Sequence, residues 1–294
     1  MLESIRTGRR TEAEGKLFSV VIPSWNNLPH LRLCLDSLRK NSRYSHQFIV
    51  VVNEGSDGTL AWAAEQTDLA YIQAERNVGL CCALNAARKL IGADYLLYAN
   101  DDMYFLPDWD VPLWSEIQKI GHRGFMLSAT MIEPAGRDPC RVIADYGADL
   151  ASFREKDLLA DQKSLVRSDW SGALWPPNVL PIDAWDLVGG LSLEFSPGLY
   201  SDPDLARKLW QIGVRVFRGK GDSLVYHFGR RTTSRISKND GRKTFLFKWG
   251  LSSNAFNREC LRLGQAPVET LPEARLSTWA RLGQRLRLIR AVFK

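Results

Sequence analysis

Two adjacent carboxylates, Asp101 and Asp102, follow an apolar segment at residues 94–99 (DYLLYA). The segment predicts a buried strand, and ionised carboxylates at the end of such a strand need a compensating partner. Mg²⁺ and Mn²⁺ prefer oxygen ligands, and their sites commonly combine one or two carboxylates with substrate phosphates. The spacing fits a divalent-metal site or a capped turn before Pro107, because a two-residue acidic motif is not specific.

The elements that must position these acids alternate between apolar strands and amphipathic helices. We predict strands at residues 17–22, 47–52, 70–73 and 94–99, and helices at about 28–38, 60–66 and 79–92, the first with Asn27 as N-cap. This alternation is typical of a doubly wound, mostly parallel α/β sheet of Rossmann-like character. The second half is less regular, with strands expected at 125–132, 214–217 and 223–228 and a helix at 204–213.

Three polar stretches lie at the ends of the predicted strands. They are residues 23–26 (PSWN), 53–55 (NEG) and 100–102 (NDD). In an open α/β sheet, ligands bind in the crevice beyond the carboxyl ends of the strands. We therefore expect the three stretches to meet at one crevice, with the acid pair on its wall.

The charge of the chain is concentrated at one end. The 294 residues carry a net charge of +6, and the last 20 hold six basic residues and no acid, so the body is balanced and a nucleic-acid groove is not expected. The N-terminal 16 residues lack the apolar region of a signal peptide, and no stretch approaches the ~20 apolar residues of a membrane span. The five cysteines have no metal-site spacing, so we expect free thiols in a reducing compartment. We therefore predict a cytoplasmic protein, which would be peripheral at the inner face of the membrane if it binds a membrane.

The ordered motifs VVIPSWNN, VVNEGSDGT, ERNVGLCCALNAA and YLLYANDDM resemble the nucleotide-binding half of glycosyltransferase family 2, which has the GT-A fold. Three downstream motifs agree as well, namely VGGLSLEF, SDPDLARKLWQIG and VYHFGRRTTS, so the resemblance covers about residues 17–230. It implies an inverting, non-processive and metal-dependent transfer of a sugar. The donor would be a nucleotide-sugar, and the acceptor a glycan or lipid-linked saccharide in the assembly of a bacterial surface polysaccharide.

The resemblance also implies roles for single residues. Asp102 stands at the main metal ligand of the family's acidic motif, for Mn²⁺ or Mg²⁺, and His227 matches a histidine that completes the metal or diphosphate site. The implied donor-binding residues are Pro23, Ser24, Trp25, Asn53, Glu54, Arg76, Asn77, Asn85, Asn100 and Asp101. A purely structural role is the alternative for His227, and also for Asn85, whose amide can tie down a loop.

Asp202 matches the catalytic base of the family, which takes the proton of the attacking hydroxyl. Because it precedes Pro203, it is also a good N-cap candidate, with Asp204 in the first turn of the helix. The sequence departs from the family pattern where Asn53, Asn100 and Ser201 replace acids. A nucleotide-sugar-binding protein with weak or no catalysis therefore stays an alternative. A nucleotidyltransferase is another, although the basic Gly-rich loop that it usually needs is absent.

Other residues could complete the site. Arg230 and Arg231 are candidates for binding diphosphate oxygens. Tryptophans 170, 175 and 185 lie in the irregular segment, which is a candidate for the acceptor site. Since tryptophans are more often buried, we expect at least two of the three in the core.

We expect an N-terminal extension (1–16), a GT-A domain (17–255, divided near residue 110 into nucleotide-sugar and acceptor halves) and a C-terminal basic tail (256–294). In the tail, Leu282, Leu286, Ile289 and Phe293 share one helical face among the basic side chains. Such a helix is typical of proteins that bind an anionic membrane surface. Packing of this face on the catalytic domain or on a second subunit is the alternative.

Overall fold

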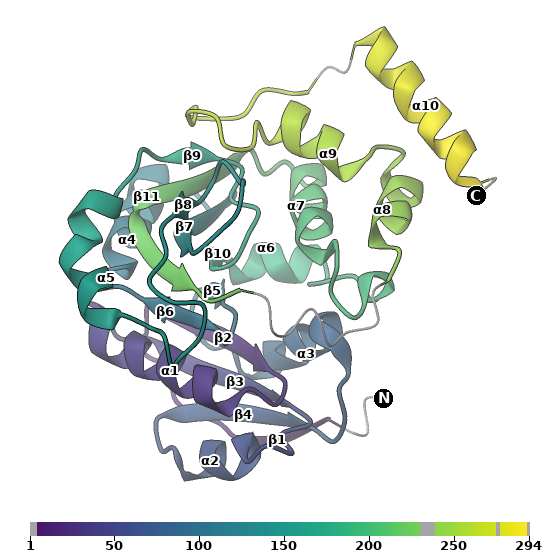
Figure 1. Cartoon of the computed structure of the whole chain (residues 1–294). Helices are drawn as coiled ribbons and strands as arrows, with labels where there is room; N and C mark the ends of the chain where they lie inside the picture. The colour runs from purple at the N-terminus through teal and green to yellow at the C-terminus, as the bar shows by residue number, and fades with distance from the viewer. Residues whose placement is uncertain (1–4, 230–238, 275–276, 293–294) are drawn as a thin grey trace.

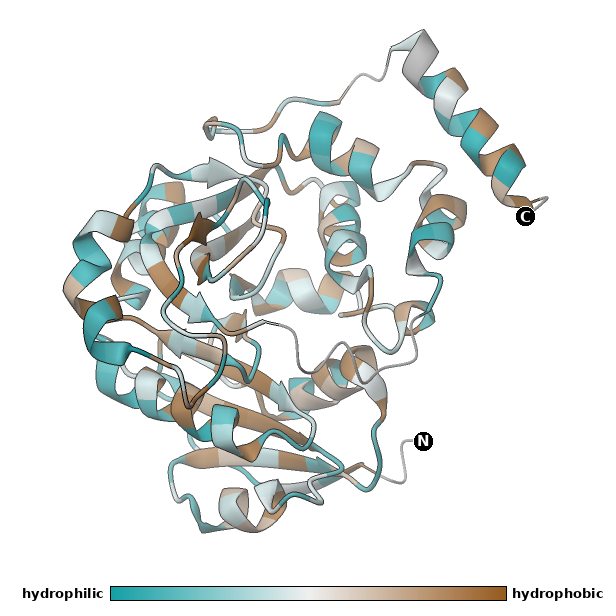
Figure 2. Ribbon diagram, in the orientation of Figure 1, coloured by the Kyte–Doolittle hydropathy of each residue, from teal (hydrophilic) through white to brown (hydrophobic). Residues whose placement is uncertain are grey.

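The computed structural model of the chain describes residues 5–229, 239–274 and 277–292 (Figure 1). Within them, one eleven-stranded mixed sheet runs through the molecule. Its main path follows the order β1-β4-β3-β2-β5-β10-β7-β11-β6. The apolar residues concentrate in these strands, as Figure 2 shows.

The first half of the chain forms the parallel part of the sheet. Its elements are β2 (Phe18–Ser24), α1 (Leu28–Asn41), β3 (Gln47–Asn53), α2 (Thr59–Glu65), β4 (Leu69–Ala74), α3 (Gly79–Ala87) and β5 (Tyr95–Tyr98). Along β3, Phe48, Val50 and Val52 pack in the core under α1, whereas Ile49 and Val51 pack in the core under α3. Burial of both faces accounts for the continuous apolar runs in the sequence. The expected doubly wound α/β fold is confirmed.

The second half continues the same sheet with mixed strand directions. Strand β10 (Asn178–Pro181) pairs antiparallel with both β5 and β7 (Phe125–Glu133). The long β11 (Val216–His227) runs parallel to β7 and antiparallel to β6 (Met103–Phe105). Two short strands lie off the main path, β8 (Val142–Ile143) and β9 (Trp170–Ser171).

The prediction of two separate strands at 214–217 and 223–228 was wrong, because β11 is continuous. The glycines between them, which look like a turn in the sequence, serve close packing instead. A Cβ atom at Gly219 would lie 1.9 Å from the ring of Trp170. The irregularity appears only as a register shift between Lys220 and Leu224, which is the signature of a bulge.

Helices and one edge strand complete the structure. Besides those above, the helices are α4 (Asp110–Ile120), α5 (Glu155–Asp161), α6 (Ile182–Leu187), α7 (Ser201–Gln211), α8 (Gly241–Trp249), α9 (Ser253–Ala255) and α10 (Thr278–Val292). Strand β1 (Ile5–Arg9), inside the predicted N-terminal extension, pairs antiparallel with the edge of β4.

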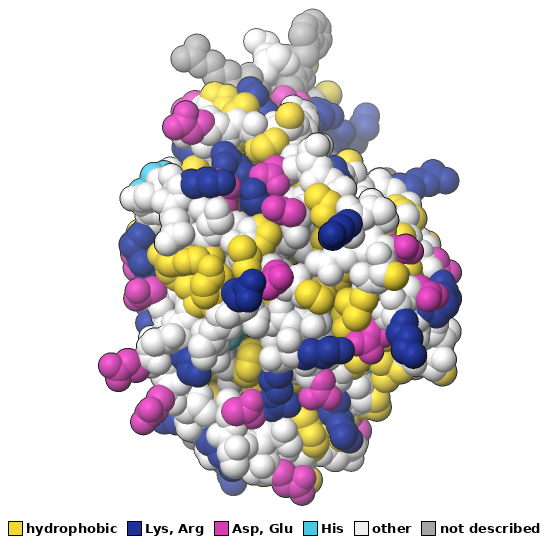
Figure 3. Space-filling view, turned by 90° about the vertical axis from the view of Figure 1, so that its left-hand side faces the viewer, with side chains coloured by type: hydrophobic (Ala, Val, Ile, Leu, Met, Phe, Trp, Pro, Cys, Tyr) yellow, Lys and Arg dark blue, Asp and Glu magenta, His cyan; other side chains and the backbone are white. Residues whose placement is uncertain are grey.

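Three global expectations can be compared with the structure. All five cysteines are free and buried. Among the described residues, no helix combines the length and apolar character that a membrane span requires. Acidic and basic side chains are intermixed over the face drawn in Figure 3, in keeping with the balanced charge of the body.

Candidate active site

A cavity of ≈ 550 Å³ opens beyond the carboxyl ends of β2, β3 and β5. Its wall includes the predicted site residues Pro23, Ser24, Trp25, Asn53, Asn77, Asn100, Asp101, Asp102, Asp202 and His227. The expected meeting of the strand ends at one crevice is therefore confirmed. The second half of the chain supplies further lining residues, including Trp175, Tyr200 and Asn257.

The two acids at the end of β5 have different environments. Asp101 is only 4% exposed, and it accepts hydrogen bonds from Ser24 Oγ (2.7 Å) and Asn27 Nδ2 (3.0 Å). Asn27 does stand at the N-cap of α1, but its side chain makes no capping bond, and Asp57 accepts from the Leu28 N–H instead. Asp101 thus ties the end of β5 to the end of β2.

Asp102 belongs to a chain of charged groups at the end of β11. Its Oδ1 lies 3.2 Å from His227 Nε2, and His227 Nδ1 lies 2.6 Å from Glu133 Oε1. Glu133 in turn forms an ion pair with Arg141. The Glu133 carboxylate therefore orients the imidazole so that Nε2 faces Asp102 and the cavity.

The pKa values of these linked side chains follow from burial and from their neighbouring charges. Burial disfavours the charged form of His227, but Asp102 and Glu133 outweigh burial and raise its pKa to about 10. For Asp102, burial alone would raise the pKa, but His227 lowers it by more, so the pKa lies below its usual value. The surroundings of Nε2 thus favour a positive charge at this point of the cavity.

The residues present fit a divalent cation that takes part of its coordination from a substrate. In the described part of the chain, no group of three His, Cys, Asp or Glu side chains could hold a metal ion. Asp102 and His227 offer one carboxylate and one imidazole, which are suitable ligands for Mn²⁺ or Mg²⁺ when phosphates complete the shell. The carboxylate behind the imidazole is the usual partner of a metal-binding histidine.

Asp202 faces the cavity from the first turn of α7. The expectation that it is the N-cap was wrong, because the helix begins at Ser201 after Tyr200, which has a φ of 71°. No described residue hydrogen-bonds its carboxylate, and burial raises its pKa from 3.8 to about 7. A carboxylate with this pKa, open to a cavity, can exchange a proton near neutral pH.

Asp204, the other acid of this turn, has a structural environment. Its side chain is fully buried, and it accepts hydrogen bonds from Ser192 Oγ (2.6 Å) and Trp249 Nε1 (2.8 Å). Lys248 Nζ also lies 2.9 Å from Asp204 Oδ1. The turn therefore contains one anchored acid and one that faces the cavity.

Several predicted donor-binding residues bind one another around the cavity. Trp25 Nε1 donates to Glu54 Oε2 (2.8 Å), so Glu54, which does not line the cavity, holds the indole that does. Asn53 donates to Asn77 Oδ1 (2.8 Å) and accepts from the Val78 N–H (2.8 Å). These bonds join the end of β3 to the start of α3.

Arg76 and Asn85 do not line the cavity. Arg76 is exposed to solvent. Asn85 Nδ2 donates to the Leu191 carbonyl (2.7 Å), and Asn85 Oδ1 accepts from the Leu191 N–H (2.8 Å). Both ends of the amide are used to tie down a loop, as in the structural alternative for this residue.

Sequence reasoning missed Glu133 and Arg141, although one signal was available. Glu133 ends β7, a predicted strand, at the same edge as the other polar strand ends.

Of the three tryptophans, Trp170 and Trp185 are 2% and 3% exposed, so the expectation of two core tryptophans is confirmed, and Trp175 lines the cavity. Arg230 and Arg231 lie outside the described residues.

The sequence is similar to known glycosyltransferases. Residues 19–161 match the family described as Glycosyl transferase family 2. Over 104 residues the chain is 31% identical to Glycosyltransferase GlyA of Streptococcus pneumoniae serotype 4, a match that covers 34% of this chain and 15% of GlyA. Over 102 residues it is 28% identical to the uncharacterized glycosyltransferase YwdF of Bacillus subtilis, covering 34% of this chain and 38% of YwdF. The matches thus span less than two thirds of either relative.

Solved structures share the fold. Residues 1–349 of S. aureus TarS in complex with UDP-GlcNAc align with a TM-score of 0.59 and 14% identity, over 94% of this chain and 72% of that chain. GalNAc-T7 with UDP, GalNAc and Mn²⁺ aligns with a TM-score of 0.55 and 14% identity, over 78% and 47% of the two chains. At these identities the likeness shows the fold, which is GT-A.

Proposed function

We propose that this chain, whose residues 19–161 match glycosyl transferase family 2, transfers a sugar from a nucleotide-sugar to a hydroxyl group, with inversion at the anomeric carbon. The acceptor is a glycan or lipid-linked saccharide of a bacterial surface polysaccharide. One observation carries the proposal: Asp202, with its raised pKa, and the Asp102–His227 pair line the same cavity. A base and a diphosphate-binding site are what this reaction needs in one place.

In this proposal the donor occupies the side of the cavity formed by the nucleotide-sugar half. The nucleotide lies against Pro23, Ser24 and Trp25, which line the cavity at the end of β2. Asp102 and His227 would hold Mn²⁺ or Mg²⁺, which when bound would stabilise the negative charge of the leaving diphosphate. UDP is the first nucleotide to test, because TarS and GalNAc-T7 have been solved with UDP or a UDP-sugar.

Asp202 acts as the general base on the acceptor. The acceptor oxygen attacks the anomeric carbon while its proton passes to the Asp202 carboxylate, and the bond to the diphosphate oxygen breaks. The pKa of about 7 supports this role, because a base is most effective when its pKa lies near the working pH. The face of Trp175, on the acceptor side, suits stacking on a sugar ring.

Thermal shift and transfer assays test this proposal together. Wild-type protein should be stabilised by a UDP-sugar in the presence of Mn²⁺, and Asp102→Ala should lose the metal-dependent part of that shift while remaining folded. Full transfer or donor hydrolysis in excess EDTA would contradict the metal dependence. Stabilisation by a UDP-sugar without any turnover, across a panel of acceptors, would favour the nucleotide-sugar-binding alternative.

A further inference from the structure

Helix α10 is attached to the body through one narrow face. It contacts α8 (Figure 1). Gln284 Oε1 accepts a hydrogen bond from the Ser252 N–H (3.0 Å). Gln284 is 9% exposed, whereas most of the described side chains of α10 are open to solvent. The polar face of the helix, rather than its apolar face, therefore binds the protein.

The apolar side chains of α10 point away from the body. Leu282, Leu286 and Ile289 are 46%, 48% and 55% exposed. At about 100° per residue they fall within a sector of about 60° opposite Gln284. Leu282, Leu286 and Ile289 therefore do not pack on the other described parts of the chain, which was one of the two alternatives for this face. Phe293, the fourth residue of the predicted apolar face, lies outside the described residues.

A basic groove of ≈ 450 Å³ lies between α8 and α10. Arg242 of α8 and Arg287 and Arg290 of α10 line it, together with Leu246, Ser252 and Ala291. No described acid forms an ion pair with any of the three arginines, unlike Arg88 and Arg123, which pair with Asp186 and Asp183. Three cations around one groove repel one another unless an anion occupies it.

We propose that this groove binds the phosphate of an anionic lipid headgroup, while Leu282, Leu286 and Ile289 enter the interface of the membrane. Guanidinium groups suit phosphate because their N–H donors match its oxygens in pairs. Exposed leucines beside the groove favour a lipid as the source of the phosphate over a soluble compound. The inference rests on the proposed function only for the lipid-linked acceptor, and its test requires no turnover.

Vesicle co-sedimentation of the full chain tests the groove. Wild-type protein should pellet at low salt with phosphatidylcholine vesicles that contain phosphatidic acid, and less with vesicles of equal charge that contain phosphatidylglycerol. Arg242→Gln, Arg287→Gln and Arg290→Gln should each lower the partition coefficient about tenfold and remove this preference. Arg285→Gln is the matched control, since Arg285 lies on α10 outside the groove and should cost about fivefold or less, without loss of the preference.

Equal losses for Arg285→Gln and for the three groove variants, with the preference for phosphatidic acid retained, would overturn the groove in favour of a diffuse charge effect. Tight binding of glycerol 3-phosphate in solution, unchanged in Leu286→Ser, would overturn the lipid source. A second copy of the chain would be the true partner if the protein dimerised in sedimentation velocity, if Leu286→Ser abolished the dimer, and if vesicles bound neither form. Circular dichroism confirms the fold of each variant, and an inactive enzyme would still give a clear result.

Discussion

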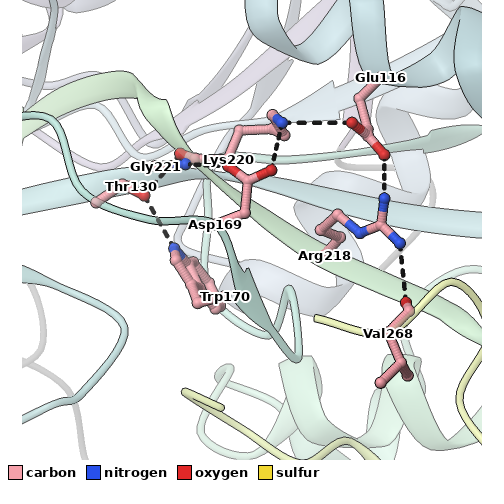
Figure 4. A network of polar contacts seen from close by, with 8 residues as sticks. All are labelled: Glu116, Thr130, Asp169, Trp170, Arg218, Lys220, Gly221 and Val268. Atoms are coloured by element: carbon pink, nitrogen blue, oxygen red, sulfur yellow. Dashed lines mark hydrogen bonds and ion pairs between the residues drawn. The ribbon is translucent and has the colours of Figure 1, made fainter. Parts of the chain in front are cut away.

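Two clusters of charged side chains lie along the same strand, β11, and they differ in how completely they are paired. In the middle of β11, Arg218 and Lys220 meet Glu116 and Asp169 (Figure 4). At its end, His227 meets Asp102 and Glu133. The first cluster does not line the cavity, whereas Asp102 and His227 do.

In the middle cluster each charged side chain has a partner of opposite charge, although Arg218 Nε has no hydrogen-bond partner among the described residues. Arg218 and Lys220 bind the two oxygens of Glu116, which is 4% exposed, and Asp169 accepts from Lys220 and from the Gly221 N–H. Arg218 also donates to the Val268 carbonyl (2.8 Å). Two acids balance two cations, so this cluster joins α4, β9, β11 and the segment before α10 without offering a group to a ligand.

The cavity that Asp102 and His227 line also contains an acid that is not paired, Asp202. His227 and Arg141 face the carboxylates of Asp102 and Glu133, whereas Asp202 lines the same cavity without a hydrogen-bond partner among the described residues. The comparison teaches that burial of charge alone does not identify a site. An acid without a partner at the wall of a cavity is a better indicator of a site, because it can still interact with a ligand.

Replacing the unpaired acid should have the largest effect on activity. Asp202→Asn removes the base and should lower kcat by about 10²–10⁴-fold. Its stability should not fall: since burial raises the pKa from 3.8 to about 7, the folded state disfavours the carboxylate, and this cost grows from about pH 4 to pH 7 and persists above. At pH 8 the variant should be more stable by on the order of 1 kcal/mol, after allowance for solvent screening. Transfer kinetics and urea unfolding measure the two effects.

Asp204→Asn is the matched control on the same turn. It weakens the bonds to Ser192, Trp249 and Lys248, so the free energy of unfolding should fall by about 1.5–3 kcal/mol. Turnover per folded molecule should stay within a few-fold of wild type. Near wild-type kcat in Asp202→Asn would show that Asp202 is not the base.

Breaking the middle cluster should affect stability alone. Glu116→Gln leaves Arg218 and Lys220 with a neutral partner in a buried position, which should cost about 3–5 kcal/mol of unfolding free energy. Because the cluster lies away from the cavity, kcat/KM per folded molecule should not change. A large loss of kcat in protein that is fully folded by circular dichroism would contradict the structural role.

Glu133→Gln should have a smaller and different effect. Gln keeps a hydrogen bond to His227 Nδ1 but removes the charge behind the imidazole, so Mn²⁺ affinity should fall about 10–100-fold. The free energy of unfolding should change less than in Glu116→Gln. Titration calorimetry with Mn²⁺ and a UDP-sugar measures the affinity, and an unchanged value would exclude Glu133 from positioning the site.

The smallest effect should appear in the pH profile. With a pKa of about 7, Asp202 loses its base form as the pH falls, so log kcat/KM should decrease below pH 7 by about one unit per pH unit. The measurement is transfer between pH 5.5 and 8.5 at saturating metal, with folding monitored at each pH. A flat profile down to pH 5.5 would show that the proton is taken by another group.

Much of the parallel half could be predicted from the sequence. Continuous apolar runs, leucines at helical spacing and polar residues at the strand ends are local signals, and they gave each element of that half within a few residues. The order of the motifs also indicated the family that residues 19–161 match. The same signals predicted that Pro23, Asn53 and Asp102 would meet, because parallel strands present their carboxyl ends at one edge.

The tertiary structure alone decided what each polar group does. Ser24 and Asp101 are 77 residues apart, and Glu133 and His227 are 94 apart, so no local pattern reports these pairs. Acids that are neighbours in the sequence, such as Asp101 and Asp102 or Asp202 and Asp204, have different partners in the structure. The physical reason is that a carboxylate takes its pKa and its role from burial and from neighbouring charges, and both are set by contacts between distant segments.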